Sequence, residues 1–160
     1  TIACADLDHS VELYDRYLGY RVVERGQVPA ALAQLWNRPG LQGRRYALAL
    51  PEGQGSTYFR FVESKLDTAY VPFRHMGWNA AELMVQNTDA CAERLAGSPF
   101  EIIGPPQDLS FTDAIRAMQL RGPAGEILYL TQALNDAEPL LGTTGMPPIE
   151  QQPQLPAQTQ

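Results

Sequence analysis

The stretch that decides the fold spans residues 5–24 and reads ADLDHSVELYDRYLGYRVVE. Between Val11 and Leu18 the apolar residues recur at the three- and four-residue spacing of a helix with one apolar face. Asp8 stands where such a helix begins, so we predict it as the N-cap. Gly19 stands where the helix should end, because glycine readily adopts the left-handed conformation of a C-terminal cap. The β-branched residues that follow predict a strand over residues 20–24.

The same order of elements occurs a second time along the chain. Each copy is predicted as a strand, a helix, a strand and a two-stranded hairpin, which is the unit βαβββ. In the first copy a short helix or lid over residues 27–40 precedes hairpin strands over 44–50 and 57–63. The second copy begins with a strand over 80–85 and a helix that is capped by Asn87 or Thr88 and ended by Gly97. A strand over 100–103 follows and breaks at Gly104-Pro105-Pro106. The hairpin strands are predicted over 114–120 and 126–131.

These elements predict an α+β fold of two tandem βαβββ modules. The first module covers residues 1–63, where the N-terminus is expected to lack part of the first strand, and the second covers residues 80–132. Residues 64–79 have no strong periodicity and are predicted as a linker between the modules. Residues 133–160 are rich in proline and glutamine and are predicted as an extended C-terminal arm. One such module would be marginal alone, whereas two can bury a shared core.

Composition excludes several classes of function. The 160 residues carry a net charge of −6, which disfavours binding to nucleic acid phosphates. No apolar run approaches the length needed to span a bilayer, so no membrane association is expected. We find no secretory leader at Thr1. The two cysteines, Cys4 and Cys91, have no C-x-x-C spacing and suit a reducing cytoplasm.

Two stretches resemble the vicinal oxygen chelate superfamily, which contains glyoxalases, bleomycin resistance proteins and extradiol dioxygenases. The first is residues 5–23, and the second is Gly122-Pro123-Ala124-Gly125 followed by Ile127-Leu128-Tyr129-Leu130. The resemblance implies that each module curls into half of an open, mixed β-sheet around a cavity. In the enzymes of this superfamily, three or four histidine or glutamate side chains there hold a divalent metal. The resemblance also implies a homodimer.

The resemblance places four metal-ligand positions, and three of them can be identified in this chain. One precedes Thr1, and the others fall at Arg60, Ala80 and Tyr129. Arginine is permanently cationic and would repel a divalent ion, and alanine has no ligating atom. We therefore predict a metal-independent protein without a cofactor. A shift of the register by two residues would bring Glu82 to the third position.

Strand alternation then predicts which side chains line the cavity. The inward-facing sets are Tyr58, Arg60 and Val62, then Ala80, Glu82 and Met84, then Ile127, Tyr129 and Thr131. Glu82, Arg60 and Tyr129 are the candidate catalytic residues. The candidate substrate-binding residues are Tyr58, His75, Trp78, Asn79, Met84 and Trp36. A mostly apolar lining with a few convergent polar groups is typical of ligand sites.

Three functions remain open. In the first, Glu82 gains proton affinity through burial and abstracts a proton next to a carbonyl, while Arg60 or Tyr129 donates to the developing oxyanion. The chain would then be an isomerase or lyase for an oxygenated aromatic or polyketide-like molecule. In the second, it is a metal-free protein that sequesters a ligand, as bleomycin resistance proteins do. In the third, it is a metal-dependent dioxygenase or glyoxalase. Arg60 and Glu82 could also simply form an ion pair.

Overall fold

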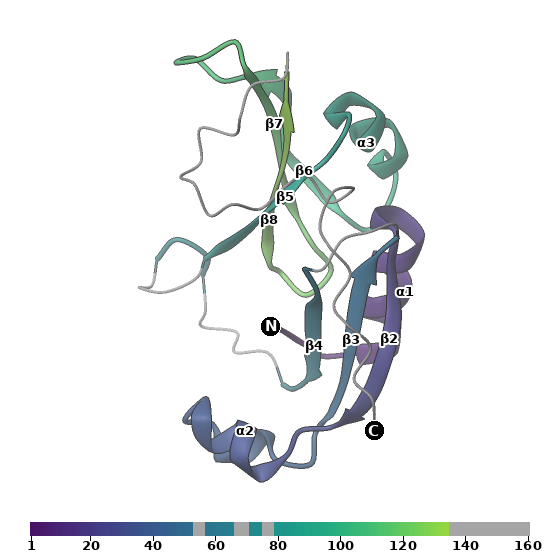
Figure 1. Cartoon of the computed structure of the whole chain (residues 1–160), viewed down its shortest axis with the longest axis vertical. Helices are drawn as coiled ribbons and strands as arrows, with labels where there is room; N and C mark the ends of the chain where they lie inside the picture. Colours follow the sequence, from purple (N-terminus) through teal and green to yellow (C-terminus); the bar gives the residue numbers. More distant parts are fainter. Residues whose placement is uncertain (53–56, 66–70, 75–78, 135–160) are drawn as a thin grey trace, which may run out of the picture. The chain divides into compact units, whose positions relative to one another are not determined.

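The computed structural model describes residues 1–52, 57–65, 71–74 and 79–134. The chain divides into two compact units, the first holding β1 to β4 and the second holding β5 to β8 (Figure 1). Each unit contains one sheet and is described by itself. The boundary between the units, at Thr68/Ala69, falls within the segment 64–79 predicted as a linker, and most of the predicted C-terminal arm lies outside the described residues.

The first unit is a four-stranded mixed sheet with α1 on one face. Its elements are β1 (Ile2–Cys4), α1 (Leu7–Leu18), β2 (Tyr20–Gln27), α2 (Ala30–Leu35), the short 3-10 helix η1 (Pro39–Leu41), β3 (Arg45–Pro51) and β4 (Phe59–Glu63). The strand order is β1-β4-β3-β2, in which β1 pairs parallel to β4 and the other pairs are antiparallel.

The N-cap of helix α1 lies two residues earlier than the sequence predicts. The N-cap is Asp6, whose side chain accepts a hydrogen bond from the backbone N–H of His9. The prediction of Asp8 as the cap is therefore wrong, because Asp8 already lies inside the first turn and pairs with arginines. The prediction for Gly19 is confirmed: its φ of 69° is left-handed, and its N–H donates to the carbonyl of Asp15.

The core of the first unit lies between α1 and the sheet. Tyr14 is fully buried and packs edge-on against the rings of Phe59 and Phe61, at centroid distances of 5.5 and 4.7 Å. Ala47 and Ala49 of β3 lie beside these rings in register and are also fully buried. Small residues on β3 leave room for the aromatic side chains, so this face is a packed core.

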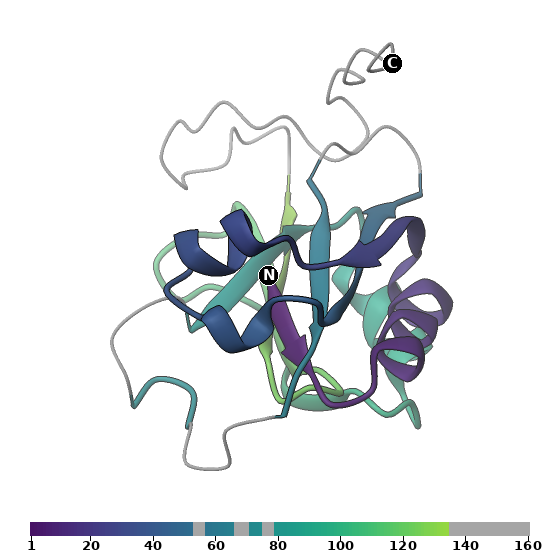
Figure 2. The same cartoon turned by 90° about the horizontal axis from the view of Figure 1, so that it is seen from below.

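The opposite face of the first sheet is covered in part by α2 and η1. A small buried cluster forms from Val28, Ala33 and Val62, with Leu32, Trp36, Leu41 and Tyr46 packed against it. Figure 2 shows α1 and α2 on opposite sides of this sheet. On α2, Ala33 is buried toward this cluster, whereas the Leu35 side chain is 80% exposed.

The second unit repeats this architecture without the α2 insertion. Its elements are β5 (Ala80–Met84), α3 (Thr88–Leu95), β6 (Glu101–Asp108), β7 (Ile115–Arg121) and β8 (Ile127–Ala133). The strand order β5-β8-β7-β6 is that of the first unit, with β5 parallel to β8. Leu95 of α3 is buried, as are Leu120, Leu128 and Leu130 of the sheet. The predicted fold class, two βαβββ modules, is confirmed.

Strand β6 continues through residues that the sequence analysis predicts as a break. It runs from Glu101 to Asp108 and includes Pro105 and Pro106. β6 is the edge strand of its sheet, where a missing backbone N–H leaves no ladder bond unmade on the outer side. Its pairing with β7 shifts register twice, so the prolines are accommodated by irregularities rather than by ending the strand.

The described residues contain no helix that is both long and apolar enough to cross a membrane.

Candidate functional site

The register of the first sheet directs Arg60 away from α1. Arg60 pairs with Leu48, and Phe61, the next residue of β4, pairs with Ala47. Because Phe61 packs on Tyr14 of α1, alternation places Arg60 on the opposite face. Arg60 and Val62 therefore share the face that α2 partly covers, as the sequence analysis predicts for these residues.

Three aromatic rings surround the Arg60 guanidinium. Its central carbon lies 5.5 Å from the ring centroid of Trp36, 5.8 Å from that of Tyr58 and 6.0 Å from that of Tyr46. These distances fall within the range of cation–π attraction. The rings come from the end of α2, from β3 and from the residue before β4, so three separate segments converge on one cation. We call Arg60, Trp36, Tyr46 and Tyr58 the aromatic cage.

The cage leaves one arginine donor without an acceptor. Arg60 Nε is buried and has no hydrogen-bond partner among the described residues. No described carboxylate of the first unit forms an ion pair with Arg60. The residue as a whole is only partly buried, and the Tyr58 side chain is 48% exposed. The cage thus combines a desolvated N–H donor with an aromatic surface that solvent can reach.

Tyr46 is held in place by its neighbours on β2. Its hydroxyl donates a hydrogen bond to a carboxylate oxygen of Glu24. This hydrogen bond raises the pKa of the Tyr46 phenol above its usual range, so the ring stays neutral. The ring lies across Gly26, where an added Cβ would sit 2.9 Å from a ring carbon. A side chain at Gly26 would therefore displace Tyr46 from the cage.

Tyr20 also has a buried hydroxyl without a partner among the described residues, but its setting differs. It packs against Tyr14 and Phe59 in the core on the α1 face and is 2% exposed. Burial raises the pKa of Tyr20 to about 12. A ligand cannot approach this hydroxyl without opening the core, so it does not belong to the candidate site.

In the second unit, the polar side chains are paired with one another. Thr131 donates from Oγ1 to Oε1 of Glu82 at 2.7 Å, and Gln119 donates from Nε2 to the Tyr129 hydroxyl at 2.8 Å. Glu82 and Tyr129 are register partners on β5 and β8. We call these four residues the polar strip.

The polar strip lies on the sheet face that points away from α3. Arg116 of β7 pairs with Asp89 of α3, and Thr88 of α3 donates to the side chain of Gln132 on β8. Even-numbered residues of β7 and β8 therefore face the helix. Residues 119, 129 and 131 face the other way, as the sequence analysis predicts for the last two.

Several predictions about single residues need correction or fall outside the description. Glu82 is exposed, so the burial expected for a carboxylate between apolar strand residues is not found. Its surroundings differ because Thr131, a polar residue, lies beside it. Arg60 and Glu82 belong to different units, and each is described within its own. His75 and Trp78 lie outside the described residues.

The other described residues that were predicted to bind substrate, Asn79, Met84 and Trp36, lie at the ends of strands or of a helix. Asn79 precedes β5, and its side-chain oxygen accepts a hydrogen bond from the backbone N–H of Phe73 at 2.9 Å. Met84 is half-buried at the end of β5, on the same face as Glu82. Trp36, predicted as a substrate-binding residue, packs in the cluster beside Val62.

Sequence reasoning missed Tyr46, Glu24 and Gln119. The alternation of β3 was visible in the sequence and places Tyr46, Leu48 and Leu50 on one face. What the sequence did not show is that Tyr46 and Leu48 pair with Val62 and Arg60 on β4. Without the strand register, an alternating tyrosine cannot be assigned to the cavity or to the core.

The residues at the expected metal positions do not fit a divalent cation. Arg60 carries a fixed positive charge, Ala80 has no donor atom, and the Tyr129 hydroxyl is engaged by Gln119. Within the described ranges, no three histidine, cysteine, aspartate or glutamate side chains gather where they could hold a metal ion.

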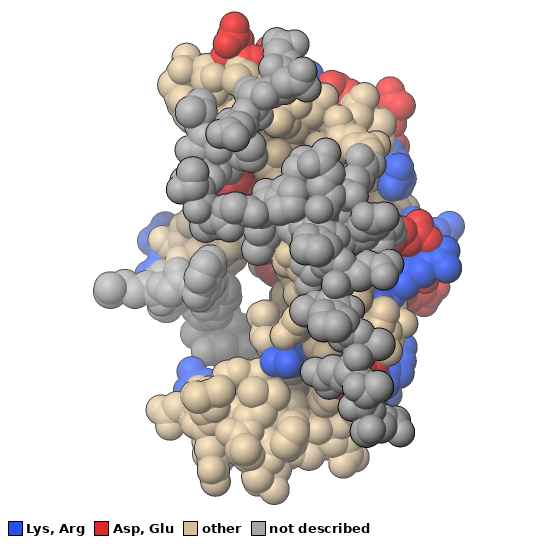
Figure 3. Space-filling model, in the orientation of Figure 1, with Lys and Arg blue, Asp and Glu red and all other residues tan. Residues whose placement is uncertain are grey.

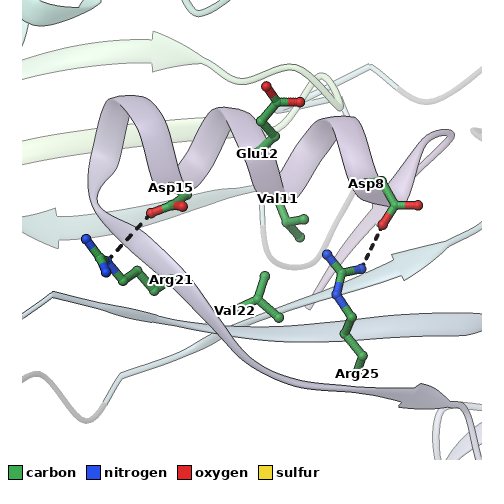
Figure 4. Close-up of a pocket in the computed structure, with 7 residues that line it drawn as sticks. All are labelled: Asp8, Val11, Glu12, Asp15, Arg21, Val22 and Arg25. Atoms are coloured by element: carbon green, nitrogen blue, oxygen red, sulfur yellow. Dashed lines mark hydrogen bonds and ion pairs between the residues drawn. The ribbon is translucent and has the colours of Figure 1, made fainter.

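A shallow groove lies between α1 and β2, with a volume of about 420 Å³. Figure 4 shows Val11 and Val22 facing each other between two ion pairs, Asp15–Arg21 and Asp8–Arg25. In Figure 3, acidic and basic side chains lie side by side over this part of the surface. The two ion pairs offset four of the charges in this groove, and Glu12 is the fifth charged residue of its lining.

No family model matches the sequence, and no curated protein matches it significantly. Solved structures do match. A glyoxalase family protein from Bacillus cereus has 17% identity and a TM-score of 0.65, covering 84% of this chain and 91% of its own. A glyoxylase/bleomycin resistance protein/dioxygenase domain from Frankia sp. has 18% identity and a TM-score of 0.62, covering 84% and 89%. TioX from Micromonospora sp. has 16% identity and a TM-score of 0.52, covering 86% and 98%. The chain therefore has the glyoxalase-like fold, which confirms the predicted resemblance at the level of structure.

Proposed function

We propose that this chain binds a small oxygenated aromatic molecule at the aromatic cage of its first unit. The observation that carries the proposal is the buried Arg60 Nε without an acceptor, in the middle of three aromatic rings. A fold that buries a donor without a partner loses stability, unless a ligand supplies the acceptor. Apolar surface with a few placed polar groups is what small-molecule sites offer.

The solved structures with this fold support the same reading. The name of the structure from Frankia sp. includes bleomycin resistance protein. A protein that sequesters a ligand needs binding contacts and no reaction chemistry, and the cage offers aromatic surface and a hydrogen-bond donor within one unit. Ligand binding is therefore the function that the described geometry supports best.

The test uses Trp36 as a reporter inside the cage. The chain has two tryptophans, so Trp78→Phe leaves the indole N–H of Trp36 as a single signal in ¹⁵N–¹H spectra. We expect naphthalene-2-carboxylate or its neutral amide to shift this signal in a saturable titration. Tyr58→Ala should weaken the response, whereas Leu35→Ser, an exposed change on α2, should leave it intact. If neither aromatic probe shifts the Trp36 signal, the proposed function is wrong.

A second candidate function is favoured by the polar strip. The hydrogen bond from Thr131 fixes one carboxylate oxygen of Glu82, which orients the group as a general base would be oriented. In this proposal Glu82 removes a proton next to a carbonyl, and the electron pair moves into an enolate whose oxygen accepts from the Tyr129 hydroxyl. Return of the proton to another carbon completes an isomerisation, and loss of a leaving group completes an elimination. No metal takes part.

Deuterium exchange separates this enzyme from a pure binding protein. In D₂O, we expect the full chain to accelerate exchange of the methyl protons of 2-acetonaphthone, as followed by ¹H NMR. Glu82→Gln should abolish the acceleration, and Glu12→Gln, an exposed glutamate of α1, should not. Equal exchange rates with and without Glu82 would rule out its role as the base.

Two further properties belong to the proposal. A cytoplasmic location is supported by Cys4 and Cys91, which are both free thiols. A homodimer is proposed from the solved structures of the same fold, and size-exclusion chromatography with light scattering tests it. A monomer at micromolar concentration would contradict the dimer and leave the cage unaffected, because the cage is complete within one unit.

A further inference from the structure

We infer that the ligand of the aromatic cage is an anion, and specifically an aromatic carboxylate. This inference rests on the proposed function and adds the charge and shape of the molecule that the cage selects. It follows from what Arg60 lacks as much as from what surrounds it.

The three rings attract the Arg60 cation but leave its N–H donors unmatched. A ring face interacts with the guanidinium through its π electrons and provides no lone pair in the plane of the N–H groups. The described part of the first unit supplies no such acceptor to Nε. The Nε–H edge of the guanidinium is therefore a donor edge to which the described residues bring no oxygen.

The carboxylate of Glu24 is engaged by Tyr46. Glu24 pairs in register with Leu48, which in turn pairs with Arg60. Its carboxylate accepts from the Tyr46 hydroxyl, and the Tyr46 ring lies across Gly26. No described carboxylate of the first unit forms an ion pair with Arg60.

The geometry of arginine selects a planar anion. The Nε–H and one Nη–H point in the same direction, and the two oxygens of a carboxylate match them in a bidentate pair. Phosphate could make the same contact, but it holds its water more strongly, and aromatic walls cannot replace that water. A carboxylate attached to a ring brings its own apolar surface. Tyr58, whose side chain is 48% exposed, offers a face on which that ring can stack.

Calorimetric titration of the full chain with three probes tests this inference. Naphthalene-2-carboxylate carries the charge and the ring, naphthalene-2-carboxamide carries the ring alone, and cyclohexanecarboxylate carries the charge alone. We expect the aromatic carboxylate to bind at least about tenfold more tightly than either of the others. Inorganic phosphate, as a fourth probe, should compete only weakly.

Arg60 variants assign the preference to one residue. Arg60→Met should lower the affinity for naphthalene-2-carboxylate about tenfold or more and leave the affinity for the amide within about twofold of the parent, because only the anion uses the donor edge. The carboxylate affinity of Arg60→Lys should lie between those of the parent and Arg60→Met, since an ammonium keeps the charge and loses the bidentate fork. Arg44→Met, which removes an exposed arginine of the same unit, should change neither affinity.

The possible outcomes separate the two claims. If the amide binds as tightly as the carboxylate and Arg60→Met changes neither, the cage binds aromatic molecules and the charge inference is wrong. If no aromatic probe binds, the proposed function itself is wrong. If phosphate binds more tightly than the aromatic carboxylate, the preference for a carboxylate is overturned. Thermal unfolding of Arg60→Met shows whether the variant is folded, and a melting temperature close to that of the parent makes these results decisive.

Discussion

The two sheets of this chain carry polar groups on corresponding faces and treat them in opposite ways. In the second unit, Glu82 is paired with Thr131 and Tyr129 with Gln119, so each polar side chain of the strip has a partner from its own sheet. In the first unit, Arg60 faces three aromatic rings, and its Nε has no described partner. The difference teaches that the polar groups of one face satisfy one another, whereas on the other face Arg60 Nε is left without an acceptor among the described residues.

The scaffolds beneath these faces are nearly the same. Both long helices begin at a residue whose side chain accepts from the N–H three positions on, Asp6 for α1 and Asn87 for α3. In each helix, the aspartate two positions after the cap forms an ion pair with an arginine of the sheet: Asp8 with Arg45, and Asp89 with Arg116. The contrast at the cage is therefore not a difference in how the modules are built.

The largest expected effect concerns the residue next to Arg60. Phe61 is fully buried against Tyr14, so Phe61→Ala should lower the free energy of unfolding by about 3–5 kcal/mol. Urea unfolding followed by circular dichroism measures it. Neighbouring positions of β4 would then show the two roles of one strand: a structural face toward α1 and a binding face away from it. A loss below about 1 kcal/mol would mean that the α1 face is not the core.

The helix caps test whether the scaffolds are equivalent. Asp6→Ala and Asn87→Ala should each cost about 0.5–2 kcal/mol, because each removes a side-chain acceptor for a backbone N–H at a helix start. The same unfolding experiment compares them, with Glu12→Ala on the exposed face of α1 as the control. If Asp6→Ala were neutral and Asp8→Ala took its place as the costly cap variant, the cap assignment would be reversed.

The polar strip should depend on its internal pairing. Thr131 is 3% exposed, and Thr131→Val keeps its shape while removing the donor to Glu82, at a cost of about 0.5–1.5 kcal/mol. A double-mutant cycle with Glu82→Leu isolates the pair. A coupling energy of zero would show that the hydrogen bond contributes nothing to stability. The polar strip could then not be contrasted with the cage as a set of groups that stabilise one another.

The smallest effect is the response of both scaffolds to acid. Hydrogen bonds from Arg45 and Arg116 lower the pKa of Asp8 and Asp89 in the folded chain. A carboxyl with a lowered folded pKa stabilises the fold above its unfolded pKa, about 3.9, and loses that contribution as pH falls through the folded pKa. Melting temperatures should therefore fall slightly more steeply below about pH 4 in the parent than in Arg45→Met or Arg116→Met. Equal slopes in all three proteins would contradict the assignment.

The sequence allowed the repeat, its helices and most strand positions to be predicted, because these depend on local periodicity and on residues such as Gly19. It failed where neighbours in space decide. Pro105 and Pro106 predicted a break, but an edge strand tolerates prolines. Asp8 looked like a cap, but two arginines from β2 and β3 engage it, and Asp6 takes the cap position.

The candidate site divides in the same way. The family resemblance and strand alternation point to Arg60 and Tyr58, and the helix or lid expected over residues 27–40 points to Trp36; that these residues bind a ligand stays a prediction. Tyr46 could not, because its place beside Arg60 depends on the pairing of β3 with β4 and on Gly26 beneath its ring. The predicted burial of Glu82 is wrong because strand alternation shows which face a side chain is on but not whether anything covers that face.

The most direct test of the account is urea unfolding of the parent and of Arg60→Met, each with and without naphthalene-2-carboxylate. Loss of the cation–π contacts and removal of a buried unpaired donor oppose each other, so the unliganded variant should stay within about 1 kcal/mol of the parent. The ligand should stabilise the parent and leave the variant unchanged. Two results would contradict the claim that Arg60 is kept unpaired for binding. One is a strong loss of stability in the unliganded variant, and the other is a ligand-induced rise in the free energy of unfolding as large in the variant as in the parent.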